Sequence, residues 1–124
     1  MSKQKSKKVL IVDDFPAMRH SIQVLMSAKG YDATEANNGL EALSVLEKES
    51  FDLIITDLVM PEMDGFDLCE KVKSNKNYKN IPVIILSTQK DVRFIMKALK
   101  LGADDYLVKP IESELLDKVI ERVF

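Results

Sequence analysis

Short apolar runs alternate along this chain with longer segments of helical periodicity, and this alternation restricts the fold more than any other feature. The runs predict five β-strands, over residues 8–12, 31–36, 51–56, 82–86 and 105–108. Three of them are nearly continuous in Val, Ile and Leu, which is typical of parallel strands covered by helices on both faces. The pattern therefore predicts an α/β fold, a (βα)5 doubly wound parallel sheet with right-handed crossovers.

The segments between the strands carry the signals of helices. Gly30 stands where a first helix would end, and Asn38 and Asp64 can cap a second and a third helix. Phe94 falls outside the apolar stripe of the fourth helix, so we expect it to be partly exposed. The stripes expected to pack inward are Met18, Ile22 and Leu25; Leu40, Leu43 and Leu46; Phe66, Cys69 and Val72; Val92, Ile95, Met96 and Leu99; and Leu115, Leu116, Val119, Ile120 and Val123.

The length and charge of the chain limit the class of protein further. A chain of 124 residues is one domain by length, and its net charge of -2 leaves no broad basic surface for nucleic acid. It has one cysteine, no signal-peptide pattern and no apolar stretch of about 18 residues, so we expect a cytoplasmic protein without membrane insertion. Residues 1–7, with Lys3, Lys5 and Lys7, are predicted to form a flexible basic tail, and residues 8–124 the domain.

Polar residues follow the predicted strands. Asp13 and Asp14 follow the first strand, Asp57 the third, Ser87 the fourth and Lys109 the fifth. Ligands of such sheets bind beyond the carboxyl ends of the strands, where the strand order reverses. If the order is 2-1-3-4-5, that point lies between the first and third strands, and the acids face each other across it.

The chemistry of this set favours a hard cation and a phosphoryl group. Three neighbouring carboxylates repel one another, and an all-oxygen ligand set without thiolate or imidazole suits Mg²⁺. On the residues alone, Asp57 is a metal ligand, a nucleophile or both. Beside a metal it could accept a phosphoryl group as an aspartyl phosphate, with Lys109 and the Ser87 hydroxyl holding the phosphoryl oxygens.

Taken together, these motifs resemble one family, the receiver domain of two-component response regulators, nearest to the single-domain chemotaxis type. The resemblance covers residues 8–124 and implies a flavodoxin-like receiver fold with strand order 2-1-3-4-5. It also implies phosphoryl transfer from a sensor histidine kinase or phosphotransfer protein, without turnover of an external substrate. The matching motifs are Val12-Asp13-Asp14, Asp57 with Met60-Pro61 and Gly65, Ser87-Thr88, Gly102-Ala103-Asp104-Asp105-Tyr106, and Lys109-Pro110.

The resemblance also implies a role for each residue near the acceptor. Asp57 is the phosphorylated residue. At the Mg²⁺ site Asp14 is the direct ligand, Asp13 holds a water molecule of the metal, and the main-chain carbonyl of Val59 is a further ligand beside Asp57. The side chains of Val59 and Gln89 border the route of the hydrolytic water. Because an apolar Val59 cannot orient a water molecule, we expect a phosphoryl group with a longer lifetime than beside a polar residue.

A second group of residues is implied to act as the switch. Ser87 and Lys109 contact the phosphoryl group, Tyr106 turns inward as Ser87 moves, and the Lys109-Pro110 peptide bond is cis. The response is read by an output protein on the face formed by the fourth helix, the fifth strand and the fifth helix.

Phe94 is a candidate for that output face. With Lys90, Arg93, Lys97 and Tyr106 it could form an amphipathic docking patch, and the alternative is packing at the periphery of the core. Some regulators with a similar fifth strand dimerise on this face through charged pairs. Apolar residues stand at several of the positions where those charges are expected, which disfavours that dimer: Ile95, Leu115 and Val119.

Two other functions compete with the switch. A degenerate receiver would act only as a protein-interaction module, although all the site residues are present. A Mg²⁺-dependent phosphatase with an aspartyl intermediate commonly has a second Asp two residues after the nucleophile, where this chain has Val59.

Overall fold

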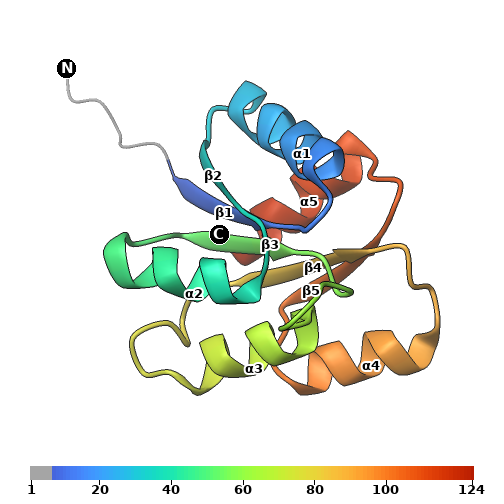
Figure 1. Ribbon diagram of the computed structural model, residues 1–124. Coiled ribbons are helices and arrows are strands. Elements are labelled where there is room, and N and C mark those ends of the chain that lie inside the picture. The colour runs from blue at the N-terminus through green and yellow to red at the C-terminus, as the bar shows by residue number, and fades with distance from the viewer. Residues whose placement is uncertain (1–6) are drawn as a thin grey trace.

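The computed structural model describes residues 7–124, which form one parallel sheet with helices on both faces (Figure 1). The strand order is β2-β1-β3-β4-β5, as predicted. The strands are β1 (Lys8–Val12), β2 (Asp32–Ala36), β3 (Leu53–Thr56), β4 (Val83–Ser87) and β5 (Asp105–Val108). The helices are α1 (Pro16–Ala28), α2 (Gly39–Lys48), α3 (Gly65–Ser74), α4 (Val92–Lys100) and α5 (Ser113–Val123).

Two hydrophobic cores, one on each face of the sheet, explain why the central strands are apolar throughout. In β1, Leu10 and Val12 pack toward α2, α3 and α4, whereas Val9 and Ile11 pack toward α1 and α5. All four residues are at most 1% exposed. Burying each such side chain contributes about 1.5–3 kcal/mol, so the strands β1, β3 and β4 hold the two layers together.

Most of the predicted element ends agree with the structure to within two residues. The Asn38 and Asp64 side chains cap α2 and α3 by accepting hydrogen bonds from Glu41 N–H and Asp67 N–H, both at 2.8 Å. Gly30 follows the end of α1 with φ +94°, a conformation that suits glycine. The predicted strand 51–56 is two residues too long, since β3 begins at Leu53. The strands predicted to begin at residues 31 and 82 each begin one residue later.

The predicted inward stripe of α4 is wrong for three of its four residues, whereas Ile95 is partly buried and packs against the core. Val92, Met96 and Leu99 are 62%, 65% and 46% exposed, and the fully buried residue of this helix is Ala98. Apolar spacing predicts an amphipathic helix, but it does not tell which face of that helix the protein covers. Leu40 of α2 and Leu115 of α5 were also expected inside and are about half exposed, at 49% and 45%.

The partial exposure predicted for Phe94 is confirmed at 38%, and the docking patch around it stays a prediction. Its ring stacks on Phe66 of α3 with the centroids 6.0 Å apart, and the Lys97 ammonium lies 4.4 Å from the centre of the Phe66 ring. Phe94 therefore packs at the periphery between α3 and α4, away from α5. The predicted tail lies outside the described residues except for Lys7, whose ammonium lies 5.3 Å from the centre of the Phe124 ring.

Candidate functional site

Three carboxylates meet at the carboxyl edge of the sheet, as the sequence predicts. Asp13 and Asp14 follow β1 and Asp57 follows β3, and these strands are neighbours with Val12 paired to Thr56. One oxygen from each carboxylate lies within 4.8 Å of the others, and we call these three residues the acidic cluster. At that separation, with an effective dielectric constant near 20, each pair of charges repels by about 3 kcal/mol. The cluster therefore needs positive charge.

Lys109, which follows β5, supplies part of that charge. Its ammonium lies 3.0 Å from Asp13 Oδ2 and 3.8 Å from Asp57 Oδ1. The side chains of Lys109 and Asp13 are 9% and 2% exposed, so water screens this ion pair poorly. One lysine leaves an excess of negative charge among the three acids, and an all-oxygen set with this excess could hold a metal ion.

The Asp57 carboxyl shows the effect of its surroundings on ionisation. Burial raises the pKa of Asp57, the Lys109 ammonium and the Leu58 N–H oppose that shift, and the charges on Asp13 and Asp14 add to it. Burial favours the neutral acid because it removes water from the charged form. A bound cation would favour the carboxylate, which is the form that binds metal or attacks phosphorus.

The loop after β3 fixes the direction of Asp57. Its main-chain N–H donates to the carbonyl of Val12 at 2.8 Å, and its Oδ1 accepts a hydrogen bond from Leu58 N–H at 2.8 Å. Gly65 N–H donates to the Leu58 carbonyl at 2.7 Å. A Cβ at position 65 would lie 2.4 Å from the Asp57 carbonyl oxygen and 2.8 Å from Leu58 Cα. A side chain there would displace the loop, so the glycine keeps Asp57 in place.

Ser87 and Tyr106 are connected through the loop after β4. The buried Ser87 hydroxyl accepts from Gln89 N–H at 3.2 Å, and the Tyr106 hydroxyl donates to the Gln89 carbonyl at 2.8 Å. Lys109 N–H donates to the Ser87 carbonyl at 2.8 Å, which ties the ends of β4 and β5 together. Tyr106 is 9% exposed, so its ring faces inward, and burial raises the pKa of its hydroxyl.

The remaining site residues lie at the rim. Val59 is 62% exposed in the loop after Asp57, and Gln89 is half-buried beyond Ser87. The predicted role of the Val59 main-chain carbonyl as a metal ligand stays a prediction. The Lys109-Pro110 bond is cis, as the resemblance implied. Two contributors were not recognised from the sequence. Gly65 was noted only as part of a motif. Arg19 carried no sequence signal, and its guanidinium contacts the segment Asp13-Asp14 after β1, which we call the acid loop.

Comparisons with known proteins agree with this site. Residues 9–121 match the response regulator receiver domain family. The chain is 38% identical over 124 residues to the chemotaxis protein CheY-3 of Vibrio cholerae, covering 96% of this chain and 95% of that protein. It is 40% identical over 118 residues to the chemotaxis protein CheY1 of Helicobacter pylori, covering 94% and 95%. The crystal structure of the chemotaxis protein CheY4 of Vibrio cholerae superposes with a TM-score of 0.91 at 35% identity, covering 97% of this chain and all of that one.

The chain belongs to the receiver domain family of two-component response regulators. Its function is phospho-signalling, and proteins of this class interact with histidine kinases and output proteins and do not turn over an external substrate. Among residues 7–124, none of the helices has the length and apolar character needed to span a membrane.

Proposed function

We propose that Asp57 accepts a phosphoryl group from a histidine kinase or a phosphotransfer protein, in a Mg²⁺-dependent reaction that switches the protein between two states. The observation that carries this proposal is the acidic cluster around the single Lys109 ammonium at the carboxyl edge of the sheet. Asp13, Asp14 and Asp57, with the main-chain carbonyl of Val59, would hold the ion. Bound Mg²⁺ would neutralise the oxygens of the phosphoryl group during transfer.

The protein's own contribution to the transfer is to position the nucleophile and bind the phosphoryl oxygens. Leu58 N–H and Lys109 both approach Oδ1 of Asp57, which leaves Oδ2 to attack. In the step, an Asp57 oxygen forms a bond to phosphorus while the bond from phosphorus to the donor's imidazole nitrogen breaks. The imidazole leaves with the electron pair. The Lys109 ammonium and the Ser87 hydroxyl would then bind phosphoryl oxygens.

The switch would run from Ser87 to Tyr106. The phosphoryl group adds a charge of about -1.5 to -2 and would attract the Ser87 hydroxyl. Ser87 is connected to Tyr106 through Gln89, in the loop after β4. The Gln89 carbonyl that accepts the Tyr106 hydroxyl belongs to that loop, so its movement changes the energy of the inward tyrosine. Phosphorylation would therefore bias a pre-existing equilibrium of this loop and ring.

The output partner would bind the α4–β5–α5 face. Support comes from the exposed apolar residues of that region, Val92, Met96 and Leu99 on α4 and Leu115 on α5. Val92, Met96 and Leu99 recur at helical spacing and so share one face of α4, and exposed apolar groups gathered on one face commonly mark protein-binding surfaces. The cytoplasmic location expected from the sequence stays a prediction.

The test is acyl-phosphate formation by the purified chain. With acetyl phosphate and Mg²⁺ we expect the mass gain of one phosphoryl group, lost after hydroxylamine treatment, and no gain in Asp57→Ala. Asp32→Asn, an exposed acid at the amino end of β2, is the matched control and should behave as the wild type. Phosphate uptake by Asp57→Ala at another residue would contradict the assignment.

The same experiment separates the competing functions. No mass gain in the intact protein, and no change on adding beryllofluoride with Mg²⁺, would favour a module that only binds a partner. Sustained turnover of an external phosphoester would favour a phosphatase.

A further inference from the structure

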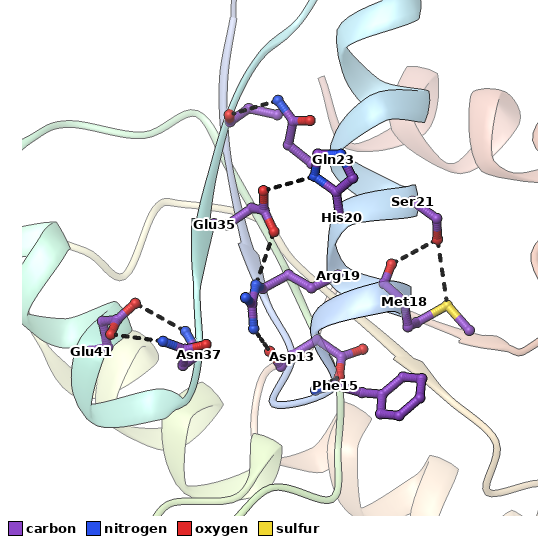
Figure 2. A network of polar contacts seen from close by, with 11 residues as sticks. Asp13, Phe15, Met18, Arg19, His20, Ser21, Gln23, Glu35, Asn37 and Glu41 are labelled. Atoms are coloured by element: carbon purple, nitrogen blue, oxygen red, sulfur yellow. Dashed lines mark hydrogen bonds and ion pairs between the residues drawn. The ribbon is translucent and has the colours of Figure 1, made fainter.

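We propose that Arg19 is a positioning residue for the metal site, acting through the main-chain carbonyl of Asp13. Arg19 lies in α1, and its side chain is 14% exposed. Its Nη1 donates to the Asp13 carbonyl at 2.8 Å, and its Nε donates to Glu35 Oε1 of β2 at 2.9 Å. Figure 2 shows the guanidinium between the acid loop and Glu35. The inference rests on the proposed Mg²⁺-dependent function and adds a residue to it.

The Asp13 carbonyl needs a partner because it lies just beyond the sheet. Asp13 N–H still donates to the Ala36 carbonyl of β2 at 3.2 Å, but β1 itself ends at Val12. A buried carbonyl without a donor costs roughly 1–3 kcal/mol. Arg19 supplies that donor from the next element, and a charged donor makes the stronger hydrogen bond.

Holding this carbonyl matters most for Asp14. The Asp13 side chain is fixed on its own, because Oδ1 accepts from Phe15 N–H at 2.9 Å and Oδ2 pairs with Lys109. The exposed Asp14 carboxylate has no hydrogen bond to any of residues 7–124. Its direction depends on the peptide plane between Asp13 and Asp14, and that plane is the one Arg19 holds. Arg19 therefore orients the Asp14 ligand without touching it.

Glu35 holds the guanidinium in turn. Its Oε1 accepts from Arg19 Nε, and its Oε2 lies 3.3 Å from Nδ1 of His20, which is 68% exposed and points away from Asp13 (Figure 2). The planar guanidinium presents two N–H donors in fixed directions, one to each partner. A lysine keeps the charge but cannot reproduce this fixed fork.

A positioning role and a purely electrostatic role of Arg19 predict opposite changes in the Mg²⁺ affinity of Arg19→Gln. If Arg19 acted only through its positive charge, Arg19→Gln would bind Mg²⁺ more tightly and Arg19→Lys would bind it unchanged. If Arg19 positions the loop, both variants bind Mg²⁺ more weakly, by about tenfold, which is in the range found when partners of metal ligands are removed.

The experiment is a calorimetric Mg²⁺ titration of the full chain at fixed pH and ionic strength. Arg122→Lys makes the same change in the exposed ion pair of Arg122 with Asp105 at the other edge of the sheet, and should leave the Mg²⁺ Kd within about twofold of the wild type. A role confined to stability would lower the free energy of unfolding but leave the Kd of the folded protein unchanged. Amide NMR shifts at Asp14 report the loop directly, and we expect them to change in Arg19→Lys before Mg²⁺ is added.

Two results would overturn the inference: wild-type affinity in Arg19→Lys, or tighter binding in Arg19→Gln. Failure of the proposed function looks different, because the wild type itself would then show no Mg²⁺ binding and no acyl phosphate.

Discussion

The two edges of the sheet hold their charges in different ways. At the amino edge, Asp104 accepts hydrogen bonds from the Lys73 ammonium at 2.9 Å and from Val83 N–H at 2.8 Å. Lys73 also donates to the Ile81 carbonyl at 2.8 Å, so one acid meets one base and both are satisfied. At the carboxyl edge, two of the three acids in the acidic cluster, Asp13 and Asp57, pair with the Lys109 ammonium, and no ion pair reaches Asp14 from residues 7–124.

The difference separates charges that stabilise the fold from charges that serve function. A balanced pair such as Lys73 with Asp104 gains little from a bound ion, because the two opposite charges already compensate each other. The acidic cluster keeps an excess of negative charge, which costs stability in the metal-free protein and could hold a cation. Such groups are expected at functional sites, where chemistry and not stability sets the arrangement.

The largest expected effect comes from removing the lysine at each edge. Lys109→Gln leaves the buried Asp13 carboxylate without its partner and should lower the free energy of unfolding by about 3 kcal/mol in EDTA. Lys73→Gln should cost about 1 kcal/mol, because Asp104 is 38% exposed and water compensates part of the loss. Urea unfolding measures both.

Adding Mg²⁺ makes this comparison sharper. The ion brings positive charge to the acidic cluster, so the deficit of Lys109→Gln relative to the wild type should shrink, whereas that of Lys73→Gln should stay the same. An equal response of the two variants to Mg²⁺ would break the distinction between the edges.

The next prediction is that the same substitution, Asp to Asn, changes the free energy of unfolding in opposite directions at the two edges. Because burial raises the pKa of Asp57, the folded protein holds that proton more tightly than the unfolded chain does. Asp57 therefore favours the folded state at low pH, and this contribution is lost as the pH rises through the folded pKa. In metal-free protein near pH 7, Asp57→Asn should raise the free energy of unfolding by about 1 kcal/mol, and Asp104→Asn should lower it by a similar amount.

Urea unfolding at two pH values checks the sign. The advantage of Asp57→Asn should shrink as the pH falls through the raised folded pKa of Asp57, because the wild-type carboxyl then takes up its proton and loses its charge. A destabilised Asp57→Asn at neutral pH would show that the carboxylate contributes to the fold, as Asp104 does.

The same contrast explains what could be predicted from the sequence. The composition of the site follows from apolar runs that end in Asp13, Asp57, Ser87 and Lys109, because parallel strands bring their carboxyl ends to one edge. The strand order was implied by the family resemblance and not by these runs. The exposed stripe of α4 was not predictable in this way. A stripe that faces solvent or a partner has the same spacing as one that faces the core.

Contacts made by the main chain also could not be predicted from the sequence. Arg19 acts on a carbonyl oxygen, which every residue has, so no side-chain pattern marks its target. Gly65 is required by its distance to the Asp57 carbonyl, and that distance depends on how the loop folds. Patterns in the sequence identify which side chains gather, whereas loop geometry decides how each is held.

The smallest expected effect concerns Val59, which brings an apolar side chain to the otherwise charged carboxyl edge. It is 62% exposed and offers no group to orient a hydrolytic water. Val59→Asn supplies an amide there and should speed loss of the phosphoryl group about threefold, or roughly 0.7 kcal/mol in activation free energy. Phosphate release after loading with acetyl phosphate measures the rate. Val24→Asn changes an exposed valine of α1 that is 51% exposed and should have no effect, and an unchanged rate in Val59→Asn would show that Val59 does not limit hydrolysis.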